Sequence, residues 1–335
     1  GGSDHASPRY IFTELTDDTR RVFREEDDAI LTYREEDGLS IEPRHYAPVL
    51  PWVLVNGAQG IATGYSTFIP SYNPQQLAQT LCAWLEHHSP FATRPLTPWV
   101  RGFTGTVAPV DGGFEFVGIV RRASNTRAIV TELPPGLWTQ NFKDWLGRQA
   151  WFTRLEEKST DTTVHIVVHT NKPLPNTDLE THFKLRKKVS LNSLVLFDTK
   201  HKLRHYANVY DILEEWAPAR LAHYSQRLQH QVADVQRSMA QAQRRQLWVE
   251  WVLTNNVSQL EKNAIEQALE SLGLMAPFND LLDMPMRSLT RDAIQRLTQQ
   301  QQRLQATLDA LRETTPVQVW LQELQEFQNK KRKRQ

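Results

Sequence analysis

The chain has 335 residues, which is enough for two or three domains, and its composition is that of an ordinary globular protein. Its formal net charge is only +1, so any nucleic-acid surface must come from a local patch rather than from bulk charge. A single cysteine, Cys82, excludes a disulfide framework and a cysteine-rich metal site. We find no apolar run long enough to span a membrane and no secretory signal, so we expect no membrane partner. The opening residues Gly1–His5 lack an initiator methionine, and we expect the chain to begin inside a larger protein.

Residues 1–76 mix short helical and extended patterns around a glycine-rich turn at Asn56–Gly64. A helix is predicted over Pro74–His87, where apolar residues recur at helical spacing. Three prolines, Pro90, Pro95 and Pro98, then mark a link to the next part of the chain.

The stretch from about residue 99 to 206 has a β-rich pattern. Runs of β-branched and aromatic residues predict strands, with turns at Gly112-Gly113 and Ser124-Asn125. Together with one short helix these strands predict a small α+β domain. The predicted strands are Thr104–Val107, Phe114–Val120, Ala128–Leu133, Thr163–His169 and Leu194–Phe197, and the helix is Thr139–Leu146.

The pattern becomes helical from Tyr210 to about Trp251, and a second helical pattern runs from Ile294 to Leu311. Each has apolar residues at coiled-coil spacing, although Gln301 fills one core position of the second. Pro218 lies near the start of the first helix, and we expect it to bend or divide that helix. The first seam is Leu221, Tyr224, Leu228, Val235 and Ala242, and the second is Ile294, Leu297, Leu304, Leu308 and Leu311.

A compact, leucine-rich segment, Asn255–Ser288, lies between the two seams. Two long helices joined by such a segment predict an antiparallel coiled-coil arm with a small globular tip. The apolar content of the tip is large for its size, and we infer that the tip dimerises. The alternative is a plain helical hairpin that packs on its own domain.

The end of the chain, Lys330–Arg334, is a block of like charge that we expect to be disordered. A nuclear-import signal, a DNA-binding tail and a solubilising end fit this block equally well.

Blocks of sequence spread over nearly the whole chain match one known family in order and spacing. Gly1–Thr13 resembles the segment that carries the catalytic arginine and tyrosine of type IIA DNA topoisomerases, and Pro51–Pro70 continues the match. The sequence is more similar to the eukaryotic and viral or phage branch than to bacterial gyrase A. The other matching blocks are Glu35–Pro43, Arg101–Thr106, Thr131–Pro134, Val189–Asn192 and Met286–Thr290.

The resemblance implies an α+β multidomain fold for the C-terminal part of the family's breakage–reunion region. Residues 1–76 would be the C-terminal part of a winged-helix domain, and residues 77–206 an α+β tower domain. Residues 207–328 would form a long antiparallel coiled-coil arm with a small helical C-gate, and residues 329–335 a basic tail. The activity implied is cleavage of both strands of duplex DNA, ATP-dependent passage of a second duplex, and religation.

Other parts of such an enzyme are not recognised in this sequence. We find no glycine-rich phosphate loop and no paired acidic motif of the kind that holds Mg²⁺ in the family's TOPRIM domain. We therefore assign no metal ligand here, and expect Mg²⁺ and ATP to bind to TOPRIM and ATPase portions upstream or on another subunit. The expected partners are double-stranded DNA, those portions, and a second copy that forms a homodimer through the C-gate. The expected location is intracellular, in the nucleus of a eukaryote or in the host cell of a virus or phage.

Two adjacent residues would carry the chemistry. By its place in the first block, Tyr10 would attack DNA, and a phenolate oxygen is both a fair nucleophile and a fair leaving group. Arg9 would present a permanently charged, planar fork to the scissile phosphate. An Arg-Tyr pair without the surrounding match is far more often structural.

Ile61 is the second candidate site residue. It follows Gly60 in the glycine-rich turn, where the backbone can approach DNA closely. The resemblance assigns this position to an isoleucine that wedges between base steps and bends the duplex. The alternative is that Ile61 is a core residue of a turn.

A basic cluster is the third candidate feature, because phosphate contacts by Lys and Arg give affinity for DNA without sequence information. The alternative is a solvated basic face. Asp198 is the only acid in the stretch from Lys184 to His205. The cluster comprises Lys184, Arg186, Lys187 and Lys188, followed by Lys200, His201, Lys202, Arg204 and His205.

Two acidic runs, Glu25–Asp28 and Glu35–Asp37, are interpreted as surface, since consecutive carboxylates rarely converge on one ion. Two other classes of protein stay open as alternatives. A non-catalytic DNA-binding or architectural protein would be favoured if Tyr10 were buried. A tyrosine recombinase or type IB topoisomerase also uses Tyr and Arg, but it needs several further Arg and His residues that we do not find before Tyr10.

Overall fold

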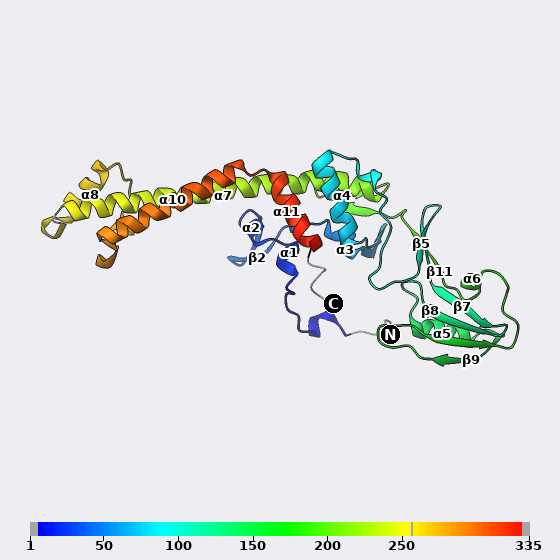
Figure 1. The fold of residues 1–335 in the computed structure, drawn as a ribbon. Coiled ribbons are helices and arrows are strands. Elements are labelled where there is room, and N and C mark those ends of the chain that lie inside the picture. The colour runs from blue at the N-terminus through cyan, green and yellow to red at the C-terminus, as the bar shows by residue number, and fades with distance from the viewer. Residues whose placement is uncertain (1–5, 256, 330–335) are drawn as a thin grey trace. The chain divides into compact units, whose positions relative to one another are not determined.

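The computed structural model describes residues 6–255 and 257–329, and Figure 1 shows its fold. The block Lys330–Arg334, for which we expect disorder, lies outside the described residues. The chain divides into two compact units, and the fold is mixed α/β, as expected. The first unit comprises Gly1–Arg24, Ala47–Arg220 and Leu321–Gln335, and the second comprises Glu25–Tyr46 and Leu221–Trp320.

The helix predicted over Pro74–His87 is confirmed residue for residue as α4. Its start is fixed by Pro74 and by the Asn73 side chain, which accepts a hydrogen bond from the backbone N–H of Gln75 at 2.9 Å. Its buried face carries Leu77, Leu81 and Leu85, which explains why apolar spacing alone predicted it. The neighbouring short elements of the first unit are η1 (Pro8–Tyr10), α1 (Thr19–Val22), α3 (Trp52–Asn56) and η2 (Phe91–Thr93).

The glycine-rich turn predicted at Asn56–Gly64 is instead a β-hairpin. Strand β3 (Ala58–Ala62) pairs antiparallel with β4 (Tyr65–Ile69), and the reversal itself is only Thr63-Gly64. Gly57 is needed at the base of the hairpin, because its φ is +73° and an added Cβ would lie 2.9 Å from the carbonyl oxygen of Ile69.

The β-rich stretch forms two larger antiparallel sheets, besides the two-stranded pair of Val195–Phe197 and Leu203–His205. One has the strand order β11-β6-β5 and the other β7-β8-β10-β9. The single strand predicted over Phe114–Val120 is wrong, because the chain leaves the first sheet at Gly118 and enters the second. A Cβ at Gly118 would lie 2.4 Å from the carbonyl oxygen of Glu132, so only glycine fits at this crossing. The bounds are β5 Thr106–Val110, β6 Gly113–Val117, β7 Ile119–Ser124, β8 Arg127–Glu132, β9 Phe152–Glu157, β10 Ile166–Thr170 and β11 Arg186–Ser190.

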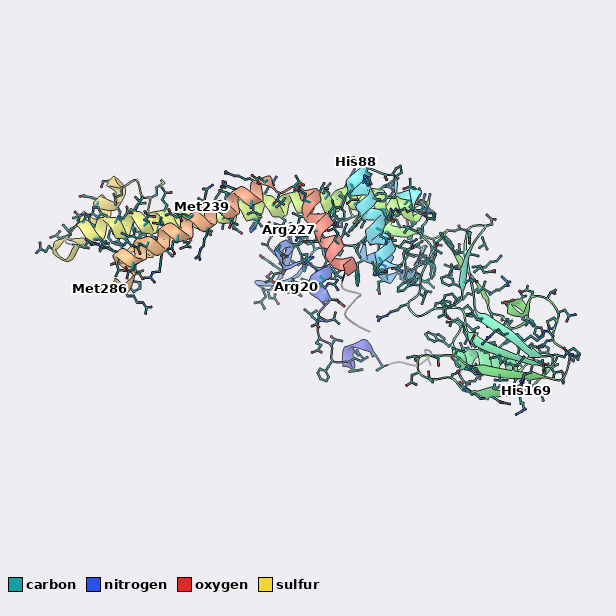
Figure 2. All side chains as sticks on the ribbon, in the orientation of Figure 1. Arg20, His88, His169, Arg227, Met239 and Met286 are labelled. Atoms are coloured by element: carbon teal, nitrogen blue, oxygen red, sulfur yellow. The ribbon has the colours of Figure 1, made fainter. Side chains whose placement is uncertain are left out.

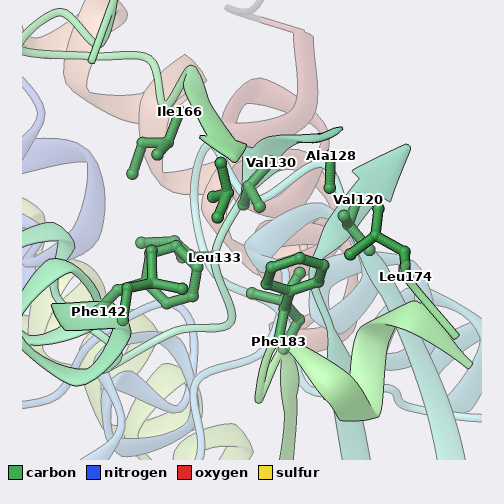
Figure 3. Packing of buried hydrophobic residues seen from close by; sticks show 11 residues of the cluster. Val120, Ala128, Val130, Leu133, Phe142, Ile166, Leu174 and Phe183 are labelled. Carbon is green, nitrogen blue, oxygen red and sulfur yellow. The ribbon is translucent and has the colours of Figure 1, made fainter. Parts of the chain in front are cut away.

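One hydrophobic cluster holds the four-stranded sheet to its helix, and Figure 3 shows its packing. Helix α5 (Thr139–Gly147), which the sequence predicted to within one residue, buries Phe142 and Leu146 completely. Val130 of β8, Ile166 of β10 and Phe183 are also fully buried in this cluster. The remaining elements of this part are α6 (Leu179–His182), β12 (Val195–Phe197) and β13 (Leu203–His205).

The first long helical pattern is one helix, α7 (Val209–Thr254), and Pro218 does not divide it. The second pattern is α10 (Arg291–Glu313), and α11 (Pro316–Asn329) follows it. Within the second unit, Trp320 stacks on Tyr224 early in α7 with ring centroids 5.4 Å apart, whereas Leu289 packs near Trp248 late in α7. Helix α10 therefore runs antiparallel to α7, as predicted and as Figure 1 draws it.

A small helical tip joins α7 to α10, and it has its own core. This core buries Trp248, Leu269, Phe278 and Leu281. Several apolar side chains of the leucine-rich segment are therefore packed inside the tip. Some apolar side chains stay outside, and Met286, labelled in Figure 2, is 88% exposed. The elements of the tip are η3 (Val257–Gln259), α8 (Lys262–Ser271), α9 (Asn279–Leu282) and η4 (Met286–Ser288).

The interpretation of both acidic runs as surface is wrong at one residue. Asp27 in α2 (Glu25–Asp28) is only 2% exposed, and it forms an ion pair of 3.5 Å with the buried side chain of Arg227 in α7. Both residues belong to the second unit, and Arg227 is labelled in Figure 2. Glu35 and Glu36 are exposed, as expected, on the hairpin of β1 (Tyr33–Glu36) and β2 (Leu39–Pro43).

Among the helices of the described residues, none carries a stretch apolar enough to cross a membrane.

The burial of Phe142 predicts how the β-rich part responds to truncation. Phe142→Ala should lower the free energy of unfolding of this part by about 3–5 kcal/mol, because it removes a fully buried aromatic side chain. Urea unfolding followed by tryptophan fluorescence measures the change. Trp138→Ala is the matched control, since Trp138 precedes the same helix and is 48% exposed; an equal loss in both variants would contradict the assigned core.

Candidate functional site

Tyr10 lies at the end of the 3-10 turn η1, where its backbone N–H donates to the carbonyl oxygen of Ser7 at 3.0 Å. Its side chain is 71% exposed, and Oη has no hydrogen-bond partner among the described residues. The guanidinium carbon of Arg9 lies 4.8 Å from the centroid of the Tyr10 ring. A phenolic hydroxyl and a permanent cation therefore face solvent together, and both can approach one phosphate group.

The segment that follows Tyr10 exposes more apolar surface. Phe12 is fully exposed and Leu15 is 77% exposed. The exposure of Tyr10 itself contradicts the condition, a buried Tyr10, under which a non-catalytic protein would have been favoured. The side chains that the structure describes within residues 6–18 add nothing to the protein core, so the turn that carries Tyr10 lies on the surface.

Ile61 lies on β3 opposite Ser66, next to the tip of the hairpin. Its side chain is 88% exposed, so the alternative of a core residue is wrong. An apolar side chain at the end of a narrow hairpin has the shape and the exposure that insertion between bases requires.

The first half of the basic cluster, Lys184 to Lys188, makes more interactions within the protein than the sequence indicated. Arg186 in β11 forms ion pairs with Glu115 at 2.9 Å and Asp178 at 3.2 Å, and the hydrogen bond to Glu115 raises the pKa of Arg186. Lys187 Nζ donates to the carbonyl oxygen of Pro135 at 2.8 Å. Lys184 Nζ lies 5.2 Å from the Trp145 ring centroid. Only the ammonium of Lys188 makes no contact of these kinds among the described residues. Glu115 lies 71 residues before Arg186 and Asp178 eight residues before it, so both lie outside the run in which charge was counted.

The second half of the cluster lies on the hairpin of β12 and β13. Arg204 in β13 is paired with Glu215 at 2.6 Å, and its guanidinium stacks over the Tyr206 ring. Lys200 and Lys202 lie in the connecting loop and are exposed. Their ammonium groups have no ion-pair partner in the described part of the chain, so this loop presents free positive charge.

Two acids shape this loop, and neither was predicted to be functional. Asp198 Oδ1 accepts from the backbone N–H groups of Lys200 and Lys202, both at 2.8 Å, and these bonds lower the Asp198 pKa, that from Lys202 most. Glu215 in α7 accepts from the backbone N–H of Thr199 at 2.8 Å, which is the main reason why its pKa is lowered. The Asp-x-Lys pattern of the loop was visible in the sequence, but nothing marked Glu215.

A cleft of about 650 Å³ lies between the hairpin β3–β4 and the basic strand β11. Gln59 of β3 and Phe68 of β4 line one side of the cleft. Lys187 and Lys188 of β11 line the other. The structure therefore brings the hairpin that carries Ile61 next to two residues of the predicted basic cluster, Lys187 and Lys188.

The described residues contain no group of three or more His, Cys, Asp or Glu side chains that could hold a metal ion. They do not fit a Mg²⁺ site, so we derive no step of the chemistry through a metal on this part of the chain.

Comparisons with known proteins agree on one family. A model of the A subunits of DNA gyrase and topoisomerase IV matches residues 1–325. DNA topoisomerase 2 of Penicillium chrysogenum is 31% identical over 376 residues, which cover 98% of this chain and 23% of that protein. DNA topoisomerase 2 of Saccharomyces cerevisiae is 32% identical over 287 residues, which cover 82% of this chain and 20% of that protein. The chain thus spans about a quarter of the length of the curated relatives it matches.

A solved structure agrees with the sequence comparisons. The crystal structure of the Plasmodium falciparum topoisomerase II DNA-binding, cleavage and re-ligation domain superimposes with a TM-score of 0.83 and 27% sequence identity. The similarity covers 98% of this chain and 50% of that one. The resemblance seen in the sequence is therefore confirmed, and the chain belongs to the family of the DNA gyrase and topoisomerase IV A subunits, within the type IIA topoisomerases.

Proposed function

We propose that this chain is the part of a type IIA topoisomerase that attacks and bends DNA. The single observation that carries the proposal is the exposed Arg9-Tyr10 pair within a match that covers residues 1–325. The protein of Plasmodium falciparum with the same fold is described as a DNA-binding, cleavage and re-ligation domain. We extend that description to this chain.

In the proposed reaction the Tyr10 phenol loses its proton and its oxygen attacks a backbone phosphorus. The bond from phosphorus to the 3′ oxygen breaks, and that oxygen takes up a proton as it leaves. The protein is then joined to the 5′ end through a phosphotyrosyl ester, and the reverse attack by the 3′ hydroxyl reseals the strand. One ester bond replaces another, so resealing needs no external energy. Arg9 stabilises the extra negative charge on the phosphate oxygens during both attacks.

Mg²⁺ would supply further charge stabilisation when bound to a TOPRIM portion, and ATP would bind to an ATPase portion. The described residues of this chain provide no cluster of ligands for the metal. We therefore propose that Tyr10 is inert without those portions.

Ile61 is proposed to insert between base steps and bend the cleaved duplex. Bending a site of 20–30 base pairs costs on the order of 1–6 kcal/mol and depends on the sequence that is bent. Any preference for cleavage sites would then come largely from DNA deformability. Phosphate contacts along the bent arms are assigned to Lys188, Lys200 and Lys202, whose ammonium groups have no ion-pair partner among the described residues, and secondarily to Lys184, Arg186, Lys187 and Arg204.

The finer layout follows the family. We propose that residues 1–76 belong to a winged-helix domain, residues 77–206 to a tower, and residues 207–328 to a coiled-coil arm with a C-gate. Apolar side chains exposed on the tip, Met275 and Met286, support a homodimer contact there. A nuclear location is proposed, since the curated relatives reported above are eukaryotic proteins.

Removing the Tyr10 hydroxyl should abolish the covalent product. The full chain, combined with the TOPRIM portion, duplex DNA and Mg²⁺, should yield protein attached to 5′ ends after denaturation. Tyr10→Phe should reduce that product at least ~1000-fold, because no other group replaces the nucleophile. Tyr65→Phe removes a hydroxyl that is also exposed and should leave the product unchanged. Persistence of the adduct in Tyr10→Phe would show that the nucleophile has been assigned wrongly.

Shortening the wedge should reduce DNA bending. Ile61→Ala should lower cleavage about tenfold, because a loss of about 1.4 kcal/mol of the bending free energy has that effect on a rate or population. Fluorescence energy transfer between the ends of a short duplex reports the bend. Leu39→Ala is the control, since it truncates an exposed apolar side chain on another hairpin, β1–β2. If Ile61→Ala bends DNA as well as the unchanged chain does, the wedge assignment is incorrect.

A further inference from the structure

We propose that Glu215 and Thr67 are positioning residues for DNA binding, which hold the basic hairpin β12–β13 in register with the hairpin that carries Ile61. The inference rests on the proposed function, and it assigns to an acidic residue a role that strengthens binding to a polyanion.

The basic hairpin has a defined loop. Asp198 Oδ1 accepts two backbone hydrogen bonds across the loop, and the Asp198 N–H donates to the carbonyl oxygen of Lys202 at 2.9 Å. His201 takes a left-handed conformation with φ of 58°, which closes the reversal. Lys200 and Lys202 therefore project from a closed, hydrogen-bonded loop. Preorganised cations lose less conformational entropy when they bind phosphates than cations on a loose loop do.

Glu215 attaches this hairpin to α7 from both strands. One carboxylate oxygen accepts from Thr199, just after β12. The other accepts from Arg204 in β13 at 2.6 Å and from the Tyr206 hydroxyl at 3.0 Å. The side chain of Glu215 is only 17% exposed, so water competes weakly for these bonds.

The opposite edge of the basic hairpin β12–β13 is joined to the hairpin β3–β4, which carries Ile61. Thr67 Oγ1 in β4 donates to the carbonyl oxygen of Val195 in β12 at 2.8 Å. The Phe68 N–H donates to the carbonyl oxygen of Ser193 at 2.9 Å. Thr67 faces Gly60 across the β3–β4 pair, one residue from Ile61. A short chain of bonds thus connects Glu215, the free lysines and the wedge.

If charge alone mattered, Glu215 would weaken binding to DNA rather than strengthen it. Removing an anion from a basic surface should raise affinity for DNA. The Glu215 charge, however, is already paired with Arg204 at 2.6 Å, so its field at a distance is small. Its geometric effect acts on two lysines that can bind phosphate. We therefore infer that loss of the anchor outweighs the loss of the negative charge.

The experiment compares Glu215→Gln with Glu214→Gln in the full chain. Glu214 is the adjacent, exposed residue of α7, and its side chain makes no hydrogen bond or ion pair among the described residues. Glu214→Gln therefore removes the same charge and leaves the contacts of Glu215 in place. Binding to a duplex of about 30 base pairs is measured over a range of salt concentrations. Glu215→Gln should bind about tenfold more weakly, with a salt slope lower by about 1 to 2, because one or two phosphate contacts are lost. Glu214→Gln should bind equally well or slightly better.

The outcomes separate this inference from the proposed function. Failure of the unchanged chain to bind duplex DNA would contradict the proposed function. Normal binding with equal effects of the two variants, or an unchanged salt slope in Glu215→Gln, would overturn the positioning role alone. In a Lys200→Ala, Lys202→Ala background, Glu215→Gln should have no further effect on affinity. A further tenfold loss there would mean that Glu215 acts through general destabilisation.

Thr67→Val tests the second connection with a side chain of the same shape. It should leave affinity and salt slope within about twofold of the unchanged chain. The bent fraction of DNA should fall about threefold, the size of effect that one neutral hydrogen bond produces. Unchanged bending in Thr67→Val would remove Thr67 from the proposal.

Discussion

Two hydrogen bonds from β4 to residues 193 and 195 connect parts of the chain that lie far apart in sequence, 128 residues in the case of Thr67 and Val195. Through them the hairpin with Ile61 is fixed against the strand that leads into the basic loop. Glu215 secures that loop to α7 from the other side. The candidate DNA surface depends on this set of bonds, because Ile61, Lys200 and Lys202 are all exposed and have little packing to hold them in place.

The turn that carries Tyr10 differs from this hydrogen-bonded surface. A backbone hydrogen bond closes it, none of its described side chains is buried, and Tyr10 and its cationic neighbour Arg9 lie in solvent. Such a segment gains its final geometry from what it contacts. In the proposed reaction, DNA and a metal-binding portion would complete the reactive centre around this turn.

Local patterns predicted the elements whose stability is local. Helix α4 has its cap, its first-turn proline and its apolar face within one short stretch, and α5 and α10 are similar in their apolar faces. Strands β9, β11 and β13 were missed, because their residues are mostly polar and their pairing depends on strands elsewhere in the fold. The strand ends at Gly118 because a Cβ there would collide with the carbonyl oxygen of Glu132, and this contact is visible only in the structure.

The residues of the candidate site also differ in how far the sequence alone could predict them. Arg9, Tyr10 and Ile61 were named because a family resemblance marked them, and the structure shows that all three are exposed. The basic cluster was found by counting charge, but Glu115, Asp178 and Glu215 reach it from other strands and helices and pair with Arg186 and Arg204. The sequence pattern indicates a surface acid at Asp27, whereas in the structure Asp27 is buried against Arg227. Charge patterns along a chain therefore indicate where charged side chains lie, but not which of them form ion pairs in the folded protein.

Tyr10 is proposed to be the residue that becomes joined to DNA. Digestion of the trapped covalent complex with protease and nuclease, followed by mass spectrometry, locates the attached nucleotide. We expect a nucleotide on the peptide that contains Tyr10, and on no peptide that contains the other exposed tyrosines, Tyr33, Tyr46 or Tyr65. A nucleotide on any of those three peptides, with the Tyr10 peptide unmodified, would contradict it.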